Sequence, residues 1–282
     1  MNDLSPQEML RRHGLRPRKS LGQHFVCDRN ILNRMVDTAE LTPASRDVVV
    51  EVGAGLGTLT RVLAGRAGRV IAVETDAALL PLLREALPPT LYPNVELVHA
   101  DVLRRAPRDL GLEPGGYSVV ANLPYYITSA VLRHFLADEA PPRRMVVMVQ
   151  REVARRAVAQ PPRMNLLAVS VQFYARPRIV MRVPAGAFFP RPDVDSAVLR
   201  LDVRPAPAVD APPATFFRVA RAGFGQRRKQ LRNALAAELG RPQAEIAAAL
   251  ETGGIDGRRR AETLSLDEWG RLVAALFPAS KA

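Results

Sequence analysis

The chain of 282 residues contains one cysteine, Cys27, and only four histidines. A single cysteine cannot form a disulfide within the chain or supply a cysteine-cluster zinc site. No stretch approaches the roughly 18 uninterrupted apolar residues of a membrane span. The N-terminal sequence also lacks the apolar centre of a signal peptide. Together these absences predict a cytoplasmic protein with no metal site and no membrane association.

Acidic residues are scarce relative to basic ones, since 28 Asp and Glu against 40 Lys and Arg leave a net charge of +12. This balance suits a polyanionic partner, although arginine-rich, high-GC genomes also produce basic chains. The positive charges gather in two segments: Arg11, Arg12, Arg16, Arg18 and Lys19 near the N-terminus, and Arg218, Arg221, Arg227, Arg228, Lys229 and Arg232 further on. The clustering favours nucleic acid as the partner.

Apolar patterns of helices and strands alternate from about residue 28. Short β-branched runs such as "DVVVEV", "RVIAVE", "VELVH", "YSVVAN" and "RRMVVMVQ" are separated by helical patterns, which predicts an α/β fold with a parallel sheet covered on both faces. Residues 165–183 and 196–203 are predicted as further strands that could run antiparallel at one edge.

A proline-rich stretch, residues 204–214, divides the chain and is predicted to be a linker. Before it we expect an α/β domain over residues 1–203, of which residues 1–27 form a basic arm. After it, residues 215–282 have helical patterns and are expected to form a small helical domain. Ser265 and Glu268 are spaced as a helix-capping box.

Glycines follow the first predicted strand in "EVGAGLGTLT", residues 51–60. Gly53, Gly55 and Gly57 allow the backbone to approach a ligand closely. The dinucleotide fingerprint has its third glycine one place later, where Thr58 stands, so this spacing weakens a nicotinamide-dinucleotide interpretation. It suits an adenosyl ligand without a pyrophosphate. A tight glycine turn with no ligand is the alternative.

Carboxylates close the next two predicted strands, at the sheet edge where open α/β folds bind ligands. Glu74 can accept hydrogen bonds from both hydroxyls of a ribose, and Asp101 can accept one from the adenine amino group. Either acid alone could be a helix N-cap or a solvated turn residue, and Asp76 is predicted to be a cap. Taken with the glycines, the two acids predict a nucleoside-binding site.

The fourth strand ends in "NLPY", residues 122–125, which resembles the signature of amino-group methyltransferases that use S-adenosylmethionine. The N6 amine of adenine is a poor nucleophile because its lone pair is delocalised into the ring. The side-chain carbonyl of Asn122 and a backbone carbonyl, that of Leu123 or Pro124, could accept its two hydrogens and localise the lone pair. No strong general base is then needed.

The two residues that follow Leu123 also suit this chemistry. Pro124 has a fixed φ and helps to hold the turn rigid. Tyr125 offers a ring face to a flipped base, and such stacking contributes about 1–3 kcal/mol. Unstacking a base costs a few kcal/mol, so a second ring would favour the flipped state. A turn with simple aromatic packing is the alternative interpretation.

Further blocks resemble those of one family, in the family's order: "RKSLGQHFVCD", "EVGAGLGTLT", "VIAVETD", "ANLPYYITSAV", "QREVARR", "VPAGAFFPRPDVDSAVLRL", "FGQRRKQLRNAL" and "RAETLSLDEW". From about residue 16 to 275 the chain resembles the small-subunit (16S) ribosomal RNA adenine N6,N6-dimethyltransferases. The resemblance implies a Rossmann-like class I methyltransferase domain with a small all-α C-terminal domain. It also implies that S-adenosylmethionine is the cofactor and that the product is N6,N6-dimethyladenosine.

The resemblance further implies the substrate, the partner and the site residues. The substrate is two adjacent adenosines in a 3′-terminal hairpin of the rRNA, within a pre-30S particle, and the enzyme is a monomer with a role in 30S biogenesis. The implied cofactor contacts are Gln23, His24, Val26, Gly53, Gly55, Glu74, Asp101 and Asn122. The implied catalytic residues are Asn122, Leu123, Pro124, Tyr125 and Phe188, and the implied RNA contacts are Arg227, Arg228, Lys229 and Arg232.

Phe188 matches the family's phenylalanine that encloses the target adenine together with Tyr125. Core packing is the alternative for Phe188, and Phe189 is the better candidate for the core. His24 stands where the family usually has asparagine, Val26 where leucine is common, and Ala54 where proline is usual.

Three rival functions remain open from the sequence. The related large-subunit rRNA adenine methyltransferases of the macrolide-resistance type are the nearest, but "QRRKQLRNAL" and "RAETLSLDEW" favour the small-subunit branch. A non-catalytic 30S assembly factor would have no need of Asn122, Pro124 and Tyr125. A small-molecule methyltransferase would have no need of the basic segments.

Overall fold

The computed structural model describes residues 4–41, 47–226 and 228–278. The chain divides into two compact units. The first consists of Met1–Ala154 and Pro177–Val203, and the second of Arg155–Arg176 and Arg204–Ala282. An α/β unit is thus followed by a helical one, and the predicted fold class is confirmed.

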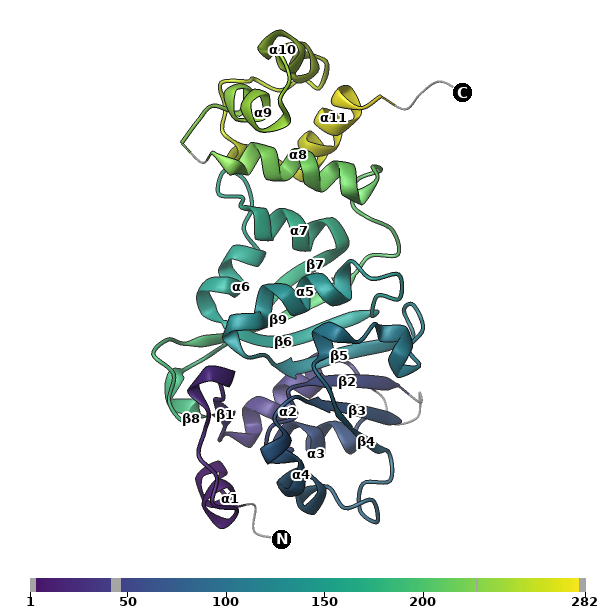
Figure 1. Cartoon of the computed structure of the whole chain (residues 1–282), viewed down its shortest axis with the longest axis vertical. Coiled ribbons are helices and arrows are strands. Elements are labelled where there is room, and N and C mark those ends of the chain that lie inside the picture. The colour runs from purple at the N-terminus through teal and green to yellow at the C-terminus, as the bar shows by residue number, and fades with distance from the viewer. Residues whose placement is uncertain (1–3, 42–46, 227, 279–282) are drawn as a thin grey trace. The chain divides into compact units, whose positions relative to one another are not determined.

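A seven-stranded sheet with the order β4-β3-β2-β5-β6-β9-β7 forms the centre of the first unit (Figure 1). Strands β4, β3, β2, β5 and β6 pair in parallel, and β9 runs antiparallel to β6, as the pattern of 196–203 allowed. The strands are β2 Val48–Val52, β3 Arg69–Glu74, β4 Val95–His99, β5 Tyr117–Asn122, β6 Arg144–Gln150, β7 Ala175–Val183 and β9 Ser196–Val203. A separate pair joins β1 Phe25–Val26 to β8 Phe188–Phe189.

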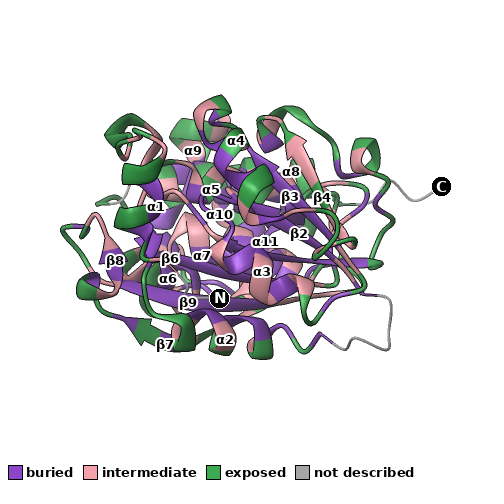
Figure 2. Ribbon diagram, turned by 90° about the horizontal axis from the view of Figure 1, so that it is seen from below, coloured by how far each residue is buried: buried purple, intermediate pink, exposed green. Residues whose placement is uncertain are grey.

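Helices occupy the connections between the strands, and their bounds are α1 Pro6–Arg12, α2 Arg29–Thr38, α3 Thr58–Ala64, α4 Leu80–Ala86, α5 Thr128–Leu136 and α6 Arg151–Ala157. The apolar face of α2 is buried at Leu32, Met35 and Val36 and packs with strand residues such as Val49 and Val70. Figure 2 shows the central strands β2, β3, β5 and β6 buried, whereas the edge strands β4 and β7 and the outer surfaces of the helices are partly exposed.

The strand order reverses between β2 and β5, which are neighbours in the sheet although β3 and β4 lie between them in the sequence. The connections from β2 and from β5 therefore leave toward opposite sides of the sheet. A crevice opens between them at the carboxyl ends of the strands, which is where α/β sheets of this kind bind ligands. The glycine loop after β2 and Asn122 at the end of β5 both lie at this point.

The second unit has its own hydrophobic core, centred on the fully buried side chains of Phe173, Phe216 and Trp269. Its helices are α7 Leu166–Tyr174, α8 Pro213–Gly225, α9 Leu231–Leu239, α10 Gln243–Thr252 and α11 Leu266–Leu276. The capping box that the sequence predicted at the start of α11 is confirmed, since Ser265 and Glu268 bond to each other's backbone.

The prediction of a strand over residues 165–183 is wrong in its first half. Residues 166–174 form α7, and only Ala175–Val183 is a strand. The apolar run is nearly continuous, and a short continuous run does not distinguish a buried strand from a helix that is buried on most sides. The Asn165 side chain begins the helix by accepting a hydrogen bond from the Ala168 N–H at 3.1 Å.

The proline-rich stretch 204–214 has no helix or strand until α8 begins at Pro213. It is nevertheless anchored, because the Ala208 N–H donates to the Phe173 carbonyl and Val209 is buried in the core of the second unit. Residues 155–176, which the sequence placed in the α/β domain, group with the C-terminal helices.

Gly223 in α8 has no room for a side chain. A Cβ atom there would lie 2.4 Å from Cη2 of the buried Trp269. Gly223→Ala is therefore expected to destabilise the protein by about 1–3 kcal/mol, the usual cost of overpacking a core. Chemical denaturation measures the change, and Gly186→Ala is the control because nothing lies within 4 Å of its added Cβ. Equal stability of both variants would contradict the packing described.

Candidate functional site

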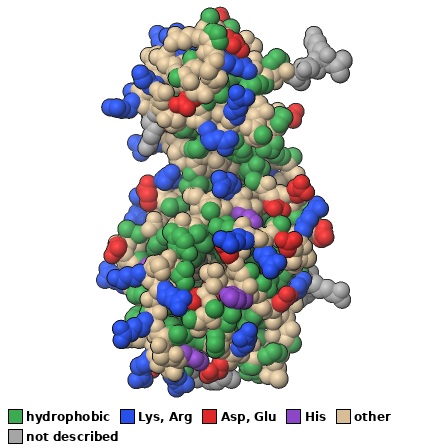
Figure 3. All heavy atoms as spheres, in the orientation of Figure 1, with side chains coloured by type: hydrophobic (Ala, Val, Ile, Leu, Met, Phe, Trp, Pro, Cys, Tyr) green, Lys and Arg blue, Asp and Glu red, His purple; other side chains and the backbone are tan. Residues whose placement is uncertain are grey.

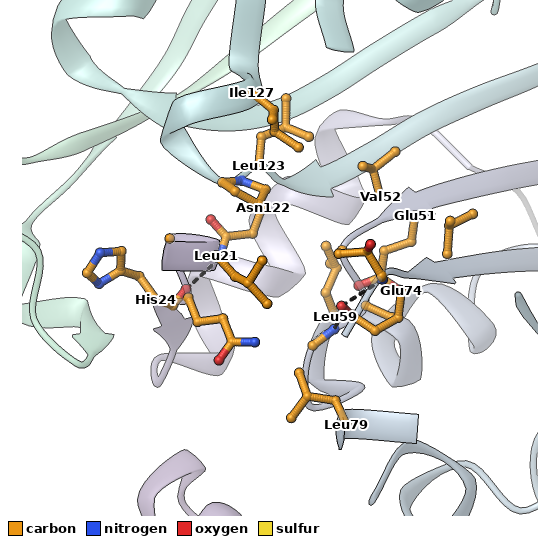
Figure 4. Close-up of a pocket in the computed structure, with 18 of the residues that line it drawn as sticks. Leu21, His24, Glu51, Val52, Leu59, Glu74, Leu79, Asn122, Leu123 and Ile127 are labelled. Carbon is orange, nitrogen blue, oxygen red and sulfur yellow. Dashed lines mark hydrogen bonds between the residues drawn. The ribbon is translucent and has the colours of Figure 1, made fainter. Parts of the chain in front are cut away.

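A pocket opens at the carboxyl ends of β2, β3 and β5 and is closed on one side by the N-terminal segment 21–26. Its lining contains every predicted cofactor residue and every predicted catalytic residue except Phe188: Gln23, His24, Val26, Gly53, Gly55, Glu74, Asp101, Asn122, Leu123, Pro124 and Tyr125. These residues come from segments about 100 positions apart in the sequence, and the sheet brings them together. Figure 4 shows Glu51 and Glu74 together on one side of the pocket, with Asn122 and His24 on the other.

The glycine loop after β2 has the left-handed backbone that its sequence allows. The φ angles are +76° at Gly53, +59° at Gly55 and +73° at Gly57, a region that other residues rarely adopt. At Gly55 an added Cβ would also lie 3.1 Å from the Phe25 ring. The loop thereby directs the Gly55 N–H toward the carboxylate of Glu74, which accepts its hydrogen bond at 2.8 Å.

Glu74 is 6% exposed and is held by three backbone N–H groups. Oε1 accepts from Thr75 and Asp76, and Oε2 accepts from Gly55. A carboxylate has about four acceptor positions, so Oε2 retains one for a ligand hydroxyl. Burial raises the pKa of Glu74, and the three backbone hydrogen bonds oppose that rise.

Glu51, in the middle of the buried β2, is a pocket residue that the sequence interpretation did not identify. It is 1% exposed, and its Oε2 atom has no hydrogen-bond partner among the described residues. Burial, reinforced by the nearby Glu74, raises its pKa to about 8. A carboxylate inside the β-branched run "VVVEV" was the available signal, because such a position rarely has a charged residue without a function.

Asp101 lies at the rim of the pocket and has one of the two roles that the sequence left open, that of a helix N-cap. Its side chain accepts from the Leu103 N–H at 3.0 Å and so caps the short 3-10 helix Val102–Arg104. The residue is exposed and lines the pocket. Its second oxygen lies 3.5 Å from the Arg104 guanidinium.

Asn122 is held in one orientation at the end of β5. Its Nδ2 donates to the carbonyl oxygen of His24 at 2.8 Å, so the opposite end of the amide, Oδ1, is available as an acceptor (Figure 4). The next residue is fixed by the Leu123 N–H, which donates to the Met148 carbonyl of β6. The carbonyl of Pro124 already accepts from the Ile127 N–H and the Thr128 hydroxyl. Of the two backbone carbonyls considered from the sequence, the one of Leu123 is therefore better placed to accept.

Tyr125 is half-buried and is positioned by two neighbours. Its hydroxyl bonds to that of Ser196 at 2.8 Å, and its ring stacks on the His24 imidazole with 5.6 Å between centroids and 23° between planes. Burial raises the pKa of Tyr125, so the phenol is neutral at physiological pH. The imidazole is fixed by its Nδ1, which donates to the Pro190 carbonyl at 2.7 Å.

The burial of the two neighbouring phenylalanines is the reverse of what the sequence predicted. Phe188 is 4% exposed and packs in the core with residues such as Val26 and Met35, away from the pocket lining. Phe189 is only partly buried. Successive residues of a strand point to opposite faces, and in β8 it is Phe188 that faces inward. Tyr126, the residue after Tyr125, is 60% exposed and lines the pocket.

The predicted RNA contacts belong to the second unit. Arg228, Lys229 and Arg232 are exposed, at the turn between α8 and α9 and on the first turn of α9. Arg227 lies outside the described residues. Figure 3 shows Lys and Arg side chains spread over the visible face of each unit, interspersed with fewer acidic ones. Positive charge is thus available on both units for a polyanionic partner.

Two further features of the described residues bear on the possible functions. They contain no cluster of three or more His, Cys, Asp or Glu side chains arranged to hold a metal ion. None of the helices in residues 4–41, 47–226 and 228–278 has the length and apolar character that crossing a membrane requires.

The raised pKa of Glu51 predicts a pH-dependent effect on stability. Its pKa lies near 4.5 in the unfolded chain and at about 8 in the folded protein, so the folded state binds the proton more tightly. Wild-type stability should therefore fall as the pH rises between these values, and Glu51→Gln should not share this loss. We expect the variant to gain up to a few kcal/mol relative to wild type between about pH 5 and about pH 9.

Urea denaturation at both pH values measures this difference. Glu113→Gln is the matched control, because Glu113 is exposed. Parallel pH profiles for wild type and Glu51→Gln would contradict the burial of a protonated carboxyl at this position.

Comparison with known proteins supports the resemblance drawn from the sequence. A family model described as "Ribosomal RNA adenine dimethylase" matches residues 14–276. A protein named "Ribosomal RNA small subunit methyltransferase A" from Dehalococcoides mccartyi is 49% identical over 267 residues, covering 94% of this chain and 90% of the relative. A protein of the same name from Pelotomaculum thermopropionicum is 46% identical over 286 residues, covering 97% of this chain and 96% of that relative.

Solved structures agree with the fold. The crystal structure of the 23S rRNA methyltransferase ErmE matches with a TM-score of 0.70 and 31% identity, over 89% of this chain and 99% of that one. The crystal structure of a dimethyladenosine transferase from Plasmodium falciparum matches with a TM-score of 0.74 and 20% identity, over 88% of this chain and 95% of that one. At this identity the match supports the fold alone. Because the family model spans almost the whole chain and the relatives are nearly half identical to it, this chain belongs to the ribosomal RNA adenine dimethylase family.

Proposed function

We propose that this protein transfers methyl groups from S-adenosylmethionine to N6 of two adjacent adenosines in a 3′-terminal hairpin of small-subunit (16S) rRNA. The product is N6,N6-dimethyladenosine. The enzyme acts as a cytoplasmic monomer on a pre-30S particle and takes part in 30S biogenesis. The observation that carries the proposal is the orientation of Asn122, whose Nδ2 is occupied by the His24 carbonyl so that Oδ1 is left to accept from an amine.

The polar groups of the pocket fit S-adenosylmethionine. Oε2 of Glu74 has an acceptor position left for a ribose hydroxyl, and Asp101 at the rim can accept from the adenine amino group. Glu51 contributes a buried carboxyl oxygen without a partner among the described residues, and a cationic ligand beside it would favour its ionised form. The positive φ angles of Gly53 and Gly55 allow the backbone to approach a nucleoside. When bound, S-adenosylmethionine supplies a methyl group made electrophilic by its sulfonium.

Activation of the amine is assigned to Asn122 and to the Leu123 backbone. Oδ1 of Asn122 and the Leu123 carbonyl accept the two N6 hydrogens and so concentrate the lone pair on nitrogen. Both acceptors are fixed before the substrate arrives, by the His24 and Met148 carbonyls respectively. Preorganised acceptors need no reorientation during the reaction. The amine proton can leave to solvent after transfer, so the mechanism requires no strong base.

Tyr125 presents its ring to the target base. The hydrogen bond to Ser196 fixes the ring plane, and the stacked His24 imidazole covers one face. A base that stacks on the face of Tyr125 now covered by His24 must displace the imidazole. Because Phe188 is buried in the core, the second side of the clamp is not assigned to it.

The relatives decide between the two rRNA substrates. Curated relatives at 46% to 49% identity are named as small-subunit methyltransferases, whereas the 23S rRNA methyltransferase ErmE is 31% identical. The exposed Arg228, Lys229 and Arg232 serve as phosphate contacts that position the RNA.

The proposal is tested by methylation of 30S particles from a dimethylation-deficient strain, followed by identification of the modified nucleosides. Methyl incorporation into 50S precursor RNA alone would overturn it.

Asn122→Ala should abolish most of this activity, because it removes the acceptor that polarises the amine. We expect kcat to fall by roughly 10²–10³-fold, as when one preorganised hydrogen bond is removed from a transition state. Asn30→Ala, at an exposed position of α2, is the control. Retained cofactor binding by Asn122→Ala, measured by calorimetry, would show that the loss arises in the chemical step. Unchanged methylation would contradict the role of Asn122.

A pair of variants at Tyr125 separates the ring from the hydroxyl. Tyr125→Ala removes the stacking surface and should lower kcat/KM for RNA by roughly 5- to 150-fold, the equivalent of about 1–3 kcal/mol. Tyr125→Phe keeps the ring, loses only the hydrogen bond to Ser196 and should lose much less. Equal losses in single-turnover methylation of 30S particles would contradict a stacking role.

A further inference from the structure

The N-terminal segment 18–24 closes one side of the pocket, and four of its residues, Leu21 to His24, line it. Gly22, with a φ of +59°, ends the short 3-10 helix Lys19–Leu21, and a Cβ added there would lie 3.3 Å from the Tyr126 ring. The segment has one fixed point at its end, where the His24 carbonyl accepts the hydrogen bond from Asn122. A second fixed point lies at its beginning.

This second point is Asp76, in the loop after β3. Oδ1 accepts from Nη1 of Arg18 at 2.9 Å, and Oδ2 accepts from Nε2 of Gln23 at 2.8 Å. The other end of the Gln23 amide, Oε1, accepts from the backbone N–H of Arg18 at 2.8 Å. Arg18, Gln23 and Asp76 therefore form a closed ring of hydrogen bonds that joins the segment to the sheet.

Asp76 does more than cap the 3-10 helix Ala77–Leu79, the role that the sequence predicted. The cap is a single bond, in which Oδ1 accepts from the Ala78 N–H at 3.1 Å. The carboxylate is only 4% exposed, and removing a buried carboxylate from water is unfavourable unless partners compensate. Gln23 and Arg18 provide that compensation, although half of the Arg18 side chain is exposed and its charge is partly screened.

The same residue is coupled to the predicted ribose site. The backbone N–H of Asp76 donates to Oε1 of Glu74 at 2.8 Å. Gln23, predicted as a cofactor contact, has both ends of its side chain engaged within the protein. Its effect on a ligand therefore comes mainly through the position of segment 18–24.

We propose that Asp76 is a positioning residue that holds segment 18–24 closed over the pocket through Gln23 and Arg18, and thereby slows release of the bound cofactor. The inference rests on the proposed function, because it takes S-adenosylmethionine as the ligand. It assigns Asp76 no contact with the ligand. It predicts that opening of the segment limits cofactor dissociation.

Four variants test the ring of bonds. Asp76→Ser can still cap the 3-10 helix but is too short to reach the segment. Asp76→Asn places an amide donor against the Gln23 donor, and Gln23→Glu places a carboxylate against the Asp76 carboxylate. In the double variant D76N/Q23E the donor and acceptor are exchanged, so the bond between the two side chains is restored. The carboxylate introduced at position 23 can still accept from the Arg18 N–H.

The measurements are the dissociation constants of S-adenosylmethionine and S-adenosylhomocysteine by calorimetry and their dissociation rates by competition. Each single variant should weaken binding roughly tenfold, the size expected for loss of a charge-assisted hydrogen bond, mainly through faster dissociation. The KM for the cofactor should rise accordingly, while kcat at saturating cofactor changes less than about threefold in Asp76→Ser and Asp76→Asn. The double variant should recover most of the affinity.

Asp28→Ser is the matched control, because Asp28 caps α2 at an exposed position outside the pocket lining. Wild-type affinity in Asp76→Ser would show that Asp76 is only a cap and overturn the inference. A double variant no better than Asp76→Asn would also overturn it. Wild-type protein that binds neither ligand would instead overturn the proposed function, on which the inference depends. Melting temperatures of all variants identify any that fail to fold.

Discussion

The hydrogen bond from Nδ2 of Asn122 to the His24 carbonyl is the contact on which the arrangement of the site depends. An asparagine amide presents a donor at one end and an acceptor at the other, and little in its shape distinguishes them. The carbonyl of His24 accepts only a donor, so it fixes which end is left for a ligand. The same bond ties β5 to the N-terminal segment, and segments about 100 residues apart thus define one acceptor.

The sheet places this contact where it can act. β5 neighbours β2, so the end of β5 lies beside the glycine loop and beyond it Glu74. Three buried carboxyl groups, Glu51 and Glu74 in the pocket lining and Asp76 outside it, differ in what compensates their burial. Glu74 has three backbone donors, Asp76 has Arg18, Gln23 and the Ala78 N–H, and Glu51 has an oxygen without a partner in the described chain. The least compensated group is the one that a positive ligand would stabilise most.

Much of the site could be predicted from the sequence, for a physical reason. Parallel strands end at the same edge of a sheet, so residues such as Glu74, Asp101 and Asn122 could be assigned to one place without knowledge of the loops. Asp76 could be recognised as a cap because capping is local. Its bonds to Arg18 and Gln23 could not, since those residues are more than 50 positions away and reach it only through the fold.

Other misses have equally specific causes. The run at 166–174 is apolar on nearly all sides, so its period does not distinguish a helix from a strand. Phe188 and Phe189 differ only in the face of β8 from which they project, and a slip of one residue exchanges them. Glu51 lies in a β-branched run that predicts a buried strand, and the same burial is what makes its carboxyl group unusual.

The most direct test of the account is a crystal structure of the protein with S-adenosylhomocysteine and adenosine 5′-monophosphate bound. We expect N6 of the substrate adenine to lie within hydrogen-bond distance of both Oδ1 of Asn122 and the Leu123 carbonyl. The bond from Nδ2 of Asn122 to His24 should remain intact. An adenine whose N6 faces neither acceptor, or an Asn122 amide turned with Nδ2 toward the base, would contradict the central claim that this amide is fixed in advance to accept from the amine.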